Sequence, residues 1–138
     1  MGIVEMKGYA RQDANDDLLS QQIVDAAFQV HSALGPGLLE SIYEACLIQE
    51  LKERGLTVES QKSLPVYYKG KKIEAAFKCD LFINENIIVE LKAVDAILPV
   101  HEAQLLTYMK LADKRLGFVI NFNTVLIKDG IKRMVRRK

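Results

Sequence analysis

The chain has 138 residues, 49% of them hydrophobic, and its 19 Lys and Arg against 18 Asp and Glu leave a net charge of +1. This length and composition predict one globular domain with its own core, and they exclude a chain that is disordered as a whole. The longest uncharged stretch, 26–39, contains Gly35-Pro36-Gly37 and is too short to cross a bilayer. Because the N-terminus has no signal-peptide pattern, we expect a cytoplasmic protein with no membrane partner.

Two helices are predicted at the start of the chain. Residues 1–15 lack periodicity and form a lead-in that we expect to be only partly ordered. Apolar residues three or four positions apart then predict a helix over 16–34. Gly35-Pro36-Gly37 ends this helix, and the same spacing predicts a second helix over 38–54.

Strands dominate the rest of the chain. A meander of three strands is predicted at 61–68, 71–83 and 87–93. A helix over 100–112 and a strand over 116–121 follow, and a terminal hairpin around Asp129-Gly130 pairs 125–127 with 131–135. This order predicts a single α/β domain over 16–138, in which helices flank a mixed sheet.

Three ionisable side chains fall on two neighbouring strands of the meander. If 84–86 form a hairpin loop, Asp80 lies directly opposite Glu90 on the same face of the sheet. The two-residue period of a strand puts Lys92 on that face too. The alternate positions of the later strand are expected to pack on a helix: Ile87, Val89 and Leu91.

The chemistry of this group has two interpretations. Opposed carboxylates repel one another unless a cation lies between them, and their hard oxygen atoms suit Mg²⁺ or Mn²⁺. A nearby lysine can orient a water molecule or stabilise charge on a phosphoryl group. The alternative is a solvent-facing hairpin with an ordinary surface ion pair. The apolar neighbours Phe82 and Ile88 favour a buried strand, where charges need partners or a metal.

The spacing of these residues is also that of a known superfamily. Asp80, followed on the next strand by Glu90-Leu91-Lys92, resembles the D…ExK core of the PD-(D/E)xK nucleases. The segment 37–43, GLLESIY, matches the signature of the GxxExxY family within that superfamily. The resemblance extends from the first helix to Ile131-Lys132-Arg133, and Cys79 departs from the proline of the superfamily name. It implies a restriction-endonuclease-like fold: an αβββαβ core with a mixed sheet, here with an extra N-terminal helix and a C-terminal β-hairpin.

The resemblance also implies roles for individual residues. Asp80 and Glu90 would bind Mg²⁺ or Mn²⁺, and Glu40 would reach the same metal from the second helix. The implied catalytic residues are Lys92, Glu40, Gln104 and Tyr108. The implied partner is a nucleic acid, DNA more than RNA.

Several of these residues have plainer explanations. An acid such as Glu40 in a first helical turn is favoured by the helix dipole alone. Tyr108 could be a half-buried core aromatic, and His101, on the same helical face, a residue that only starts the helix. His31 stands alone and is best explained as a boundary residue, and two cysteines without CxxC spacing are expected in the core: Cys46 and Cys79.

The C-terminus is strongly basic. Five of the last seven residues carry positive charge: Lys132, Arg133, Arg136, Arg137 and Lys138. Such a tail is either a solvated terminus or a contact for phosphate groups, because neutralising phosphates releases counterions.

The resemblance implies a Mg²⁺-dependent nuclease that hydrolyses phosphodiester bonds. Two alternatives remain open. One is a nuclease-fold domain that binds nucleic acid or a protein without cleaving, and the other is a small structural or interaction domain. Cutting both strands of a duplex would require a homodimer, and the sequence leaves the oligomeric state open.

Overall fold

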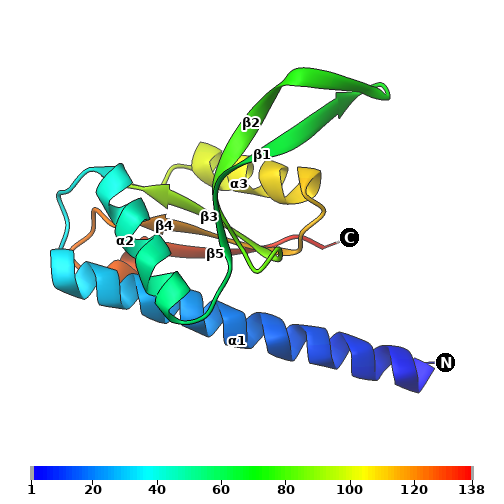
Figure 1. Cartoon of the computed structure of the whole chain (residues 1–138), viewed down its shortest axis with the longest axis horizontal. Helices are drawn as coiled ribbons and strands as arrows, with labels where there is room; N and C mark the ends of the chain where they lie inside the picture. The colour runs from blue at the N-terminus through cyan, green and yellow to red at the C-terminus, as the bar shows by residue number, and fades with distance from the viewer. Residues whose placement is uncertain (1, 138) are drawn as a thin grey trace.

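The computed structural model describes residues 2–137, with side chains for 14–73 and 77–137. In this part of the chain, three helices cover a five-stranded sheet (Figure 1). In chain order the elements are α1 (Gly2–Leu34), α2 (Glu40–Glu53), β1 (Val58–Tyr68), β2 (Lys71–Ile83), β3 (Ile87–Lys92), α3 (Pro99–Leu111), β4 (Leu116–Asn121), the short 3₁₀ helix η1 (Ile127–Gly130) and β5 (Ile131–Val135).

The sheet is mixed, as the sequence predicted. Its strands lie in the order β1-β2-β3-β4-β5, and every neighbouring pair is antiparallel except β3 and β4. A parallel pair needs a crossover connection, and α3 supplies it. β3 is the central strand and is buried from Ile87 to Leu91, which explains why its sequence is apolar on both faces.

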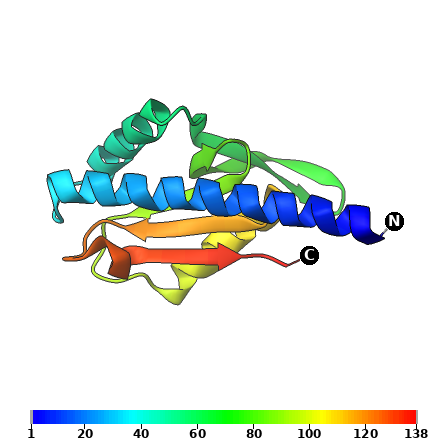
Figure 2. The same ribbon diagram turned by 90° about the horizontal axis from the view of Figure 1, so that it is seen from below.

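Helices lie on both faces of the sheet. α1 and α2 cover one face, and Figure 2 shows α1 running along the strands. The core on this side includes Ile23 from α1, Leu47 from α2 and Val89 from β3. On the other face, Leu105 and Met109 of α3 belong to a second, smaller core. The expectation that alternate residues of β3 pack on helices is therefore confirmed.

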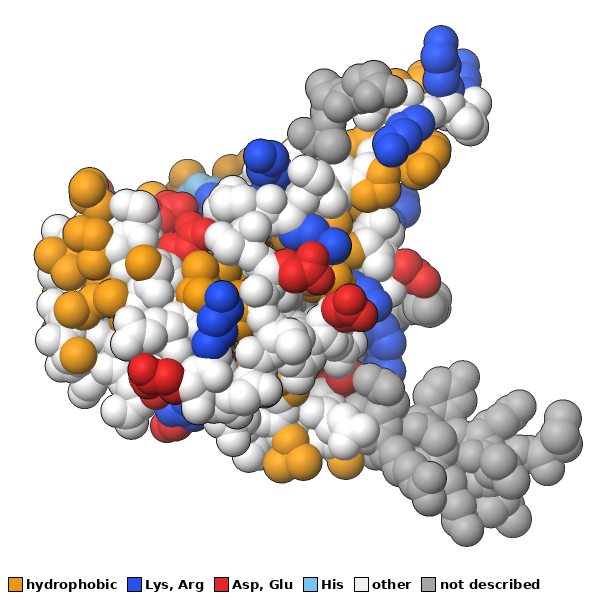
Figure 3. Space-filling model, viewed as in Figure 1, with side chains coloured by type: hydrophobic (Ala, Val, Ile, Leu, Met, Phe, Trp, Pro, Cys, Tyr) orange, Lys and Arg blue, Asp and Glu red, His pale blue; other side chains and the backbone are white. Residues whose placement is uncertain are grey.

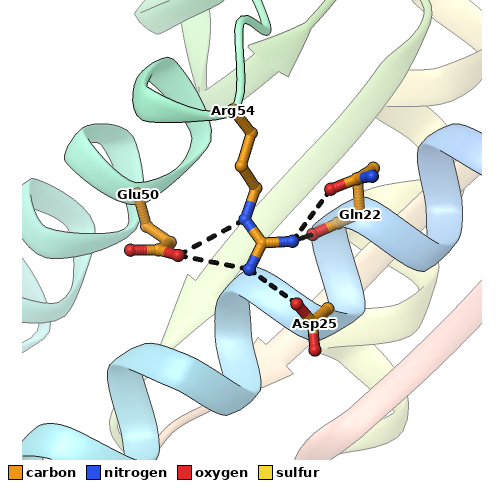
Figure 4. A network of polar contacts seen from close by, with 4 residues as sticks. All are labelled: Gln22, Asp25, Glu50 and Arg54. Atoms are coloured by element: carbon orange, nitrogen blue, oxygen red, sulfur yellow. Dashed lines mark hydrogen bonds and ion pairs between the residues drawn. The ribbon is translucent and has the colours of Figure 1, made fainter.

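Arg54 joins the two helices of the first face (Figure 4). Arg54 comes directly after α2. One nitrogen of its guanidinium group lies 2.6 Å from a carboxylate oxygen of Asp25 in α1 and 3.2 Å from one of Glu50 in α2. The guanidinium group also donates a hydrogen bond to the side chain of Gln22 at 2.8 Å. One planar group with several donors thereby fixes how α2 lies on α1.

The first helix is longer than the sequence predicted. The structure begins α1 at Gly2, within the segment 1–15 that we interpreted as a lead-in. This segment contains no proline, and its many good helix formers offset the cost of Gly8, so a helix can continue backward from 16–34. No helix in the described part of the chain is both long and apolar enough to cross a membrane.

The predicted pairing of the terminal strands is wrong. Residues 125–127 do not form a strand, and β5 pairs with β4 instead, so that Ile131 lies opposite Ile120. β4 presents a six-residue edge to β5, whereas 125–127 could offer only a very short partner. The longer ladder satisfies more backbone groups and buries more apolar surface.

Gly130 sits where this connection returns to the sheet. A Cβ atom at this position would clash with the carbonyl oxygen of Asn121. We therefore expect Gly130→Ala to lower the free energy of unfolding by about 1–3 kcal/mol, measured by urea denaturation. Lys128→Ala, an exposed change in the same 3₁₀ helix, is the control and should leave stability unchanged. Equal stability of the two variants would contradict the close approach.

Candidate active site

The predicted acidic pair lies where β2 and β3 separate. The ladder between these strands runs from Ile83 opposite Ile87 to Leu81 opposite Val89, which confirms the predicted register. Beyond this ladder, hydrogen bonds from backbone N–H groups to side-chain carboxylates connect the two strands. The backbone N–H of Asp80 donates to Glu90 Oε1 at 3.1 Å, and the N–H of Leu91 donates to Asp80 Oδ2 at 2.8 Å. Each carboxylate thus holds the backbone of the opposite strand.

Glu90 is a buried acid beside a second acid. It is 5% exposed, and burial, followed by the negative charge of Asp80, raises its pKa from 4.5 to about 9. A hydrogen bond with the side chain of Asp80 raises the pKa of Glu90 further, whereas the bond from the backbone of Asp80 lowers it. The positive charge of Lys92 lowers the pKa of Glu90 but does not offset the burial. Glu90 therefore keeps its proton at neutral pH in the metal-free fold.

Glu40 and Lys92 are the other two ionisable residues that the sequence predicted for this site. Glu40 is the first residue of α2 and is largely exposed. Partial desolvation, followed by repulsion from Asp80, raises its pKa, and the charge of Lys92 lowers it. Because these effects fall off with distance, all four ionisable groups lie in one neighbourhood. The start of α2 and the end of β3 therefore both lie near the acidic pair.

The sequence did not indicate two further residues near this group, Gln61 and Glu44. Gln61 of β1 interrupts the ladder opposite Asp80 and has a φ of 52°, a left-handed conformation that is uncommon for a residue other than glycine. Its side-chain amide donates to Asp80 Oδ1 at 3.2 Å and to Glu44 Oε1 at 3.2 Å. Gln61 therefore ties β1 and α2 to Asp80.

The predicted residues of α3 divide into two groups. Tyr108 is 8% exposed and stacks on Phe77 with ring centroids 4.4 Å apart, as a core aromatic would. Burial, then the charges of Glu90 and Asp80, raise its pKa, so it also borders the acidic pair. Its side chain is hydrogen-bonded to that of Gln104. Tyr108 thus contributes to both the core and the site, and Gln104 lies beside it.

The two histidines have structural partners. His101 Nδ1 accepts a hydrogen bond from the backbone N–H of Leu98 at 3.0 Å, so it caps the start of α3. His31 Nε2 donates to the carbonyl of Thr124 at 2.8 Å. These contacts support the plainer explanation for both residues.

The two cysteines lie in the core, as expected. Cys46 is half-buried against the core under α1 and α2. Cys79 is fully buried, and burial followed by the charge of Glu90 raises its pKa to about 11. It therefore remains a thiol at neutral pH and does not add a ligand to the acidic pair.

Tyr43 has a structural role in the turn before α2. Its ring stacks on Phe122 with centroids 4.7 Å apart, and its hydroxyl donates to the carbonyl of Gly35 at 2.5 Å. The same hydroxyl accepts a hydrogen bond from the backbone N–H of Leu38 at 3.0 Å. Tyr43 thereby fixes the turn that leads into Glu40.

Replacing Tyr43 with Phe should therefore destabilise the fold without disturbing the ring stack. We expect the free energy of unfolding to fall by about 1 kcal/mol, because the hydroxyl bonds are lost. Thermal denaturation of Tyr43→Phe measures the effect. Tyr67→Phe, at a tyrosine that is 61% exposed, is the matched control. An unchanged melting temperature for Tyr43→Phe would contradict this role.

Asn121 holds the chain that leaves β3. It is 1% exposed and lies opposite Lys92 in the ladder between β3 and β4. Its side chain accepts a hydrogen bond from the backbone N–H of Val94 at 3.1 Å and donates one to the carbonyl of Val94 at 2.9 Å. The segment after Lys92 is thus clamped to β4.

The donor set is suited to a hard divalent cation. Asp80 and Glu90 offer carboxylate oxygens, the ligands that Mg²⁺ and Mn²⁺ prefer, and a cation would replace the proton that Glu90 holds. Among the side chains that the structure describes, no three His, Cys, Asp or Glu residues converge closely enough to hold a metal ion. The acidic pair is therefore assembled, whereas Glu40 does not yet complete a three-ligand group.

The basic C-terminus is partly bound to the body of the domain. Arg133 lies 3.6 Å from Asp17, and Arg136 binds Asp113 at 2.7 Å and the carbonyl of Lys114 at 3.0 Å. Both arginines thus have partners within the fold, and residues up to Val135 form strand β5.

Comparisons with known proteins agree with this geometry at the level of the superfamily. Neither curated proteins nor solved structures gave a match. A family model described as the PD-(D/E)XK nuclease superfamily matches residues 17–134, from α1 to β5. This range includes the acidic pair, Lys92 and every strand of the mixed sheet. With its restriction-endonuclease-like fold and a match over most of its length, the chain belongs to the PD-(D/E)XK nuclease superfamily.

Proposed function

We propose that this domain is a metal-dependent nuclease of the GxxExxY branch and that DNA is its substrate. The observation that carries the proposal is the pair formed by half-buried Asp80 and buried Glu90, each bonded to the backbone of the opposite strand, with Lys92 close enough to shift the pKa of Glu90. Such a pair raises the free energy of the metal-free site, which a structural role alone would not require. Divalent metal binding would relieve this cost.

The residues of the site suggest a division of work. Asp80 and Glu90 would hold the metal, and Glu40 would join them through a water molecule or a small side-chain movement. A bound Mg²⁺ or Mn²⁺ would polarise the phosphoryl oxygen and lower the pKa of a bound water molecule. Lys92 would stabilise the negative charge that develops on the phosphate. Tyr108, whose raised pKa keeps it protonated, would donate a hydrogen bond to the substrate, and Gln104 would orient its hydroxyl.

Cleavage of labelled single- and double-stranded DNA and RNA, with Mg²⁺ or Mn²⁺, tests this function. We expect the native chain to cut DNA and Asp80→Asn to be inactive. Asp129→Asn, at an exposed acid in η1, is the control and should retain activity. If the folded native chain binds metal but cuts none of these substrates, the proposal is wrong.

A nuclease-fold domain that binds nucleic acid without cleaving it is the alternative. The incomplete three-ligand group among the described residues favours this alternative. Binding measurements on the same substrates separate the two functions, because a binding domain would retain affinity and show no turnover in any metal.

A further inference from the structure

The outer part of the β1–β2 hairpin projects from the body of the domain (Figure 1). We call residues 61–79 the β1–β2 arm. Its strands remain paired to the end, where Tyr67 lies opposite Lys72 and Tyr68 opposite Lys71. Both tyrosines are exposed, 61% and 64% respectively. The arm is therefore a two-stranded ribbon with an exposed aromatic tip.

Positive charge is concentrated on the arm. Residues 61–79 contain five lysines and one glutamate, a net charge of +4, while the rest of the chain carries −3. Lys69, Lys71 and Lys72 are exposed at the tip, and Figure 3 shows Lys and Arg side chains gathered along the projecting hairpin. Among the described side chains, no acid forms an ion pair with these three lysines. Unlike Arg133 and Arg136, they are available to an anionic partner.

The turn at the tip has a lysine at a position where asparagine would form a more stable turn. Lys69 and Gly70 have φ angles of 51° and 77°, as in the type I′ turn that Asn-Gly forms best. Lysine is poorly suited to this left-handed position. Lys69 Nζ lies 5.5 Å from the centre of the Tyr68 ring, so the lysine and the tyrosine form one cationic, aromatic surface.

The base of the arm belongs to the acidic site. Gln61 donates a hydrogen bond to Asp80, and Phe77 stacks on Tyr108. β2 continues without interruption from the tip at Lys71 to Asp80. A molecule that lies along the arm therefore leads directly to the acidic pair.

We propose that the β1–β2 arm binds duplex DNA by inserting its tip into the major groove and thereby presents the phosphate backbone to the acidic pair. This inference rests on the proposed nuclease function. The major groove of B-DNA admits a two-stranded ribbon, whereas that of A-form RNA is too narrow. Single strands are bound in basic grooves, whereas the arm projects from the surface. The lysines contact phosphates, and the tyrosines contact bases without a strong sequence preference.

The arm is tested separately from catalysis by measuring how a triple variant binds duplex DNA. The variant is Lys69→Asn/Lys71→Gln/Lys72→Gln. The Asn at position 69 preserves the type I′ turn, and all three changes are at exposed positions. Lys52→Gln/Lys110→Gln/Lys128→Gln, three exposed lysines outside the arm, removes the same charge and is the control. Fluorescence anisotropy with a labelled DNA duplex is measured in an Asp80→Asn background, so that the probe is not cut.

We expect the arm variant to bind duplex DNA at least about tenfold more weakly near 0.1 M salt. The slope of log K against log salt concentration should also become less steep, by up to about 0.9 for each phosphate contact that is lost. The control should bind like the parent, and duplex RNA and single strands should be affected little by the arm changes. Equal affinity of the arm variant and the control would overturn the inference, as would an equal loss on single strands. If the native chain cuts DNA while the arm variant binds normally, only the arm inference fails. If the chain binds duplex DNA through the arm but cuts nothing, only the proposed nuclease function fails.

Discussion

Replacing Lys92 with Met is expected to lower kcat for DNA cleavage by about 10²–10³-fold without weakening Mg²⁺ binding. Lys92 is a positive charge that lowers the pKa of both Glu90 and Glu40, and in the proposed mechanism it would lie beside the bound phosphate. Under the proposed function, its removal would take away a group that stabilises the transition state and would make the site more negative. The catalytic rate should therefore fall while the affinity for a cation is kept or increased.

Single-turnover cleavage at saturating Mg²⁺ and calorimetric titration with Mg²⁺ measure these two effects separately. Lys110→Met, at an exposed position near the end of α3, is the matched control and should leave both unchanged. Lys92→Arg keeps the charge and should recover part of the rate. A loss of Mg²⁺ affinity as large as the loss of rate would show instead that Lys92 only maintains the fold of the metal site.

The strand pair that carries the site could be predicted because its geometry is local. Three residues separate Ile83 from Ile87, and a loop of that length sets the register of a hairpin. The two-residue period of a strand then fixes which side chains share a face with Asp80. The approach of Glu40 is different. It depends on how α2 packs on the sheet, and only the resemblance to a family indicated it.

The residues that the sequence did not reveal act through long-range contacts or unusual backbone. Asn121 looks like the last polar residue of a strand, and its clamp on Val94 depends on the crossover that brings β3 and β4 together. Gln61 has a left-handed φ that its residue type does not favour. The pairing of β5 is also decided by long-range contacts. The local sequence allows β5 to pair either with the nearby segment 125–127 or with β4, and β4 is the partner only because its edge is free in the assembled sheet. None of these features has a local sequence signal.

Glu90→Gln is expected to raise the melting temperature of the metal-free domain at pH 8 by several degrees and to abolish cleavage. The pKa of Glu90 is raised from 4.5 to about 9 in the fold. Between these values the folded state holds a proton that the unfolded chain releases, so stability is greatest at low pH and is lost as the pH rises toward 9. A neutral amide removes this pH dependence because it has no proton to release.

Thermal denaturation from pH 5 to pH 9, with EDTA and with Mg²⁺, measures the effect. In EDTA the melting temperature of the native chain should fall with rising pH, while that of Glu90→Gln should fall much less. Mg²⁺ should stabilise the native chain most at high pH, where the ligand is free of its proton, and should hardly stabilise the variant. Glu53→Gln, at an exposed acid near the end of α2, should behave like the native chain.

The combination of effects at Glu90 distinguishes a metal ligand from a residue that supports the fold. Replacing a residue that supports the fold lowers the stability of the protein. A buried acid that binds a metal instead destabilises the fold while the metal is absent, so replacing it raises stability. Replacing this ionisable carboxyl group with an amide should therefore both stabilise the metal-free chain and abolish its activity. If Glu90→Gln melts below the native chain in EDTA at pH 8, the hydrogen bond that the backbone N–H of Asp80 donates to Glu90 stabilises the fold by more than the burial of an ionisable acid costs. The acidic pair would then be a structural feature of the sheet, and the case for a metal site would be lost.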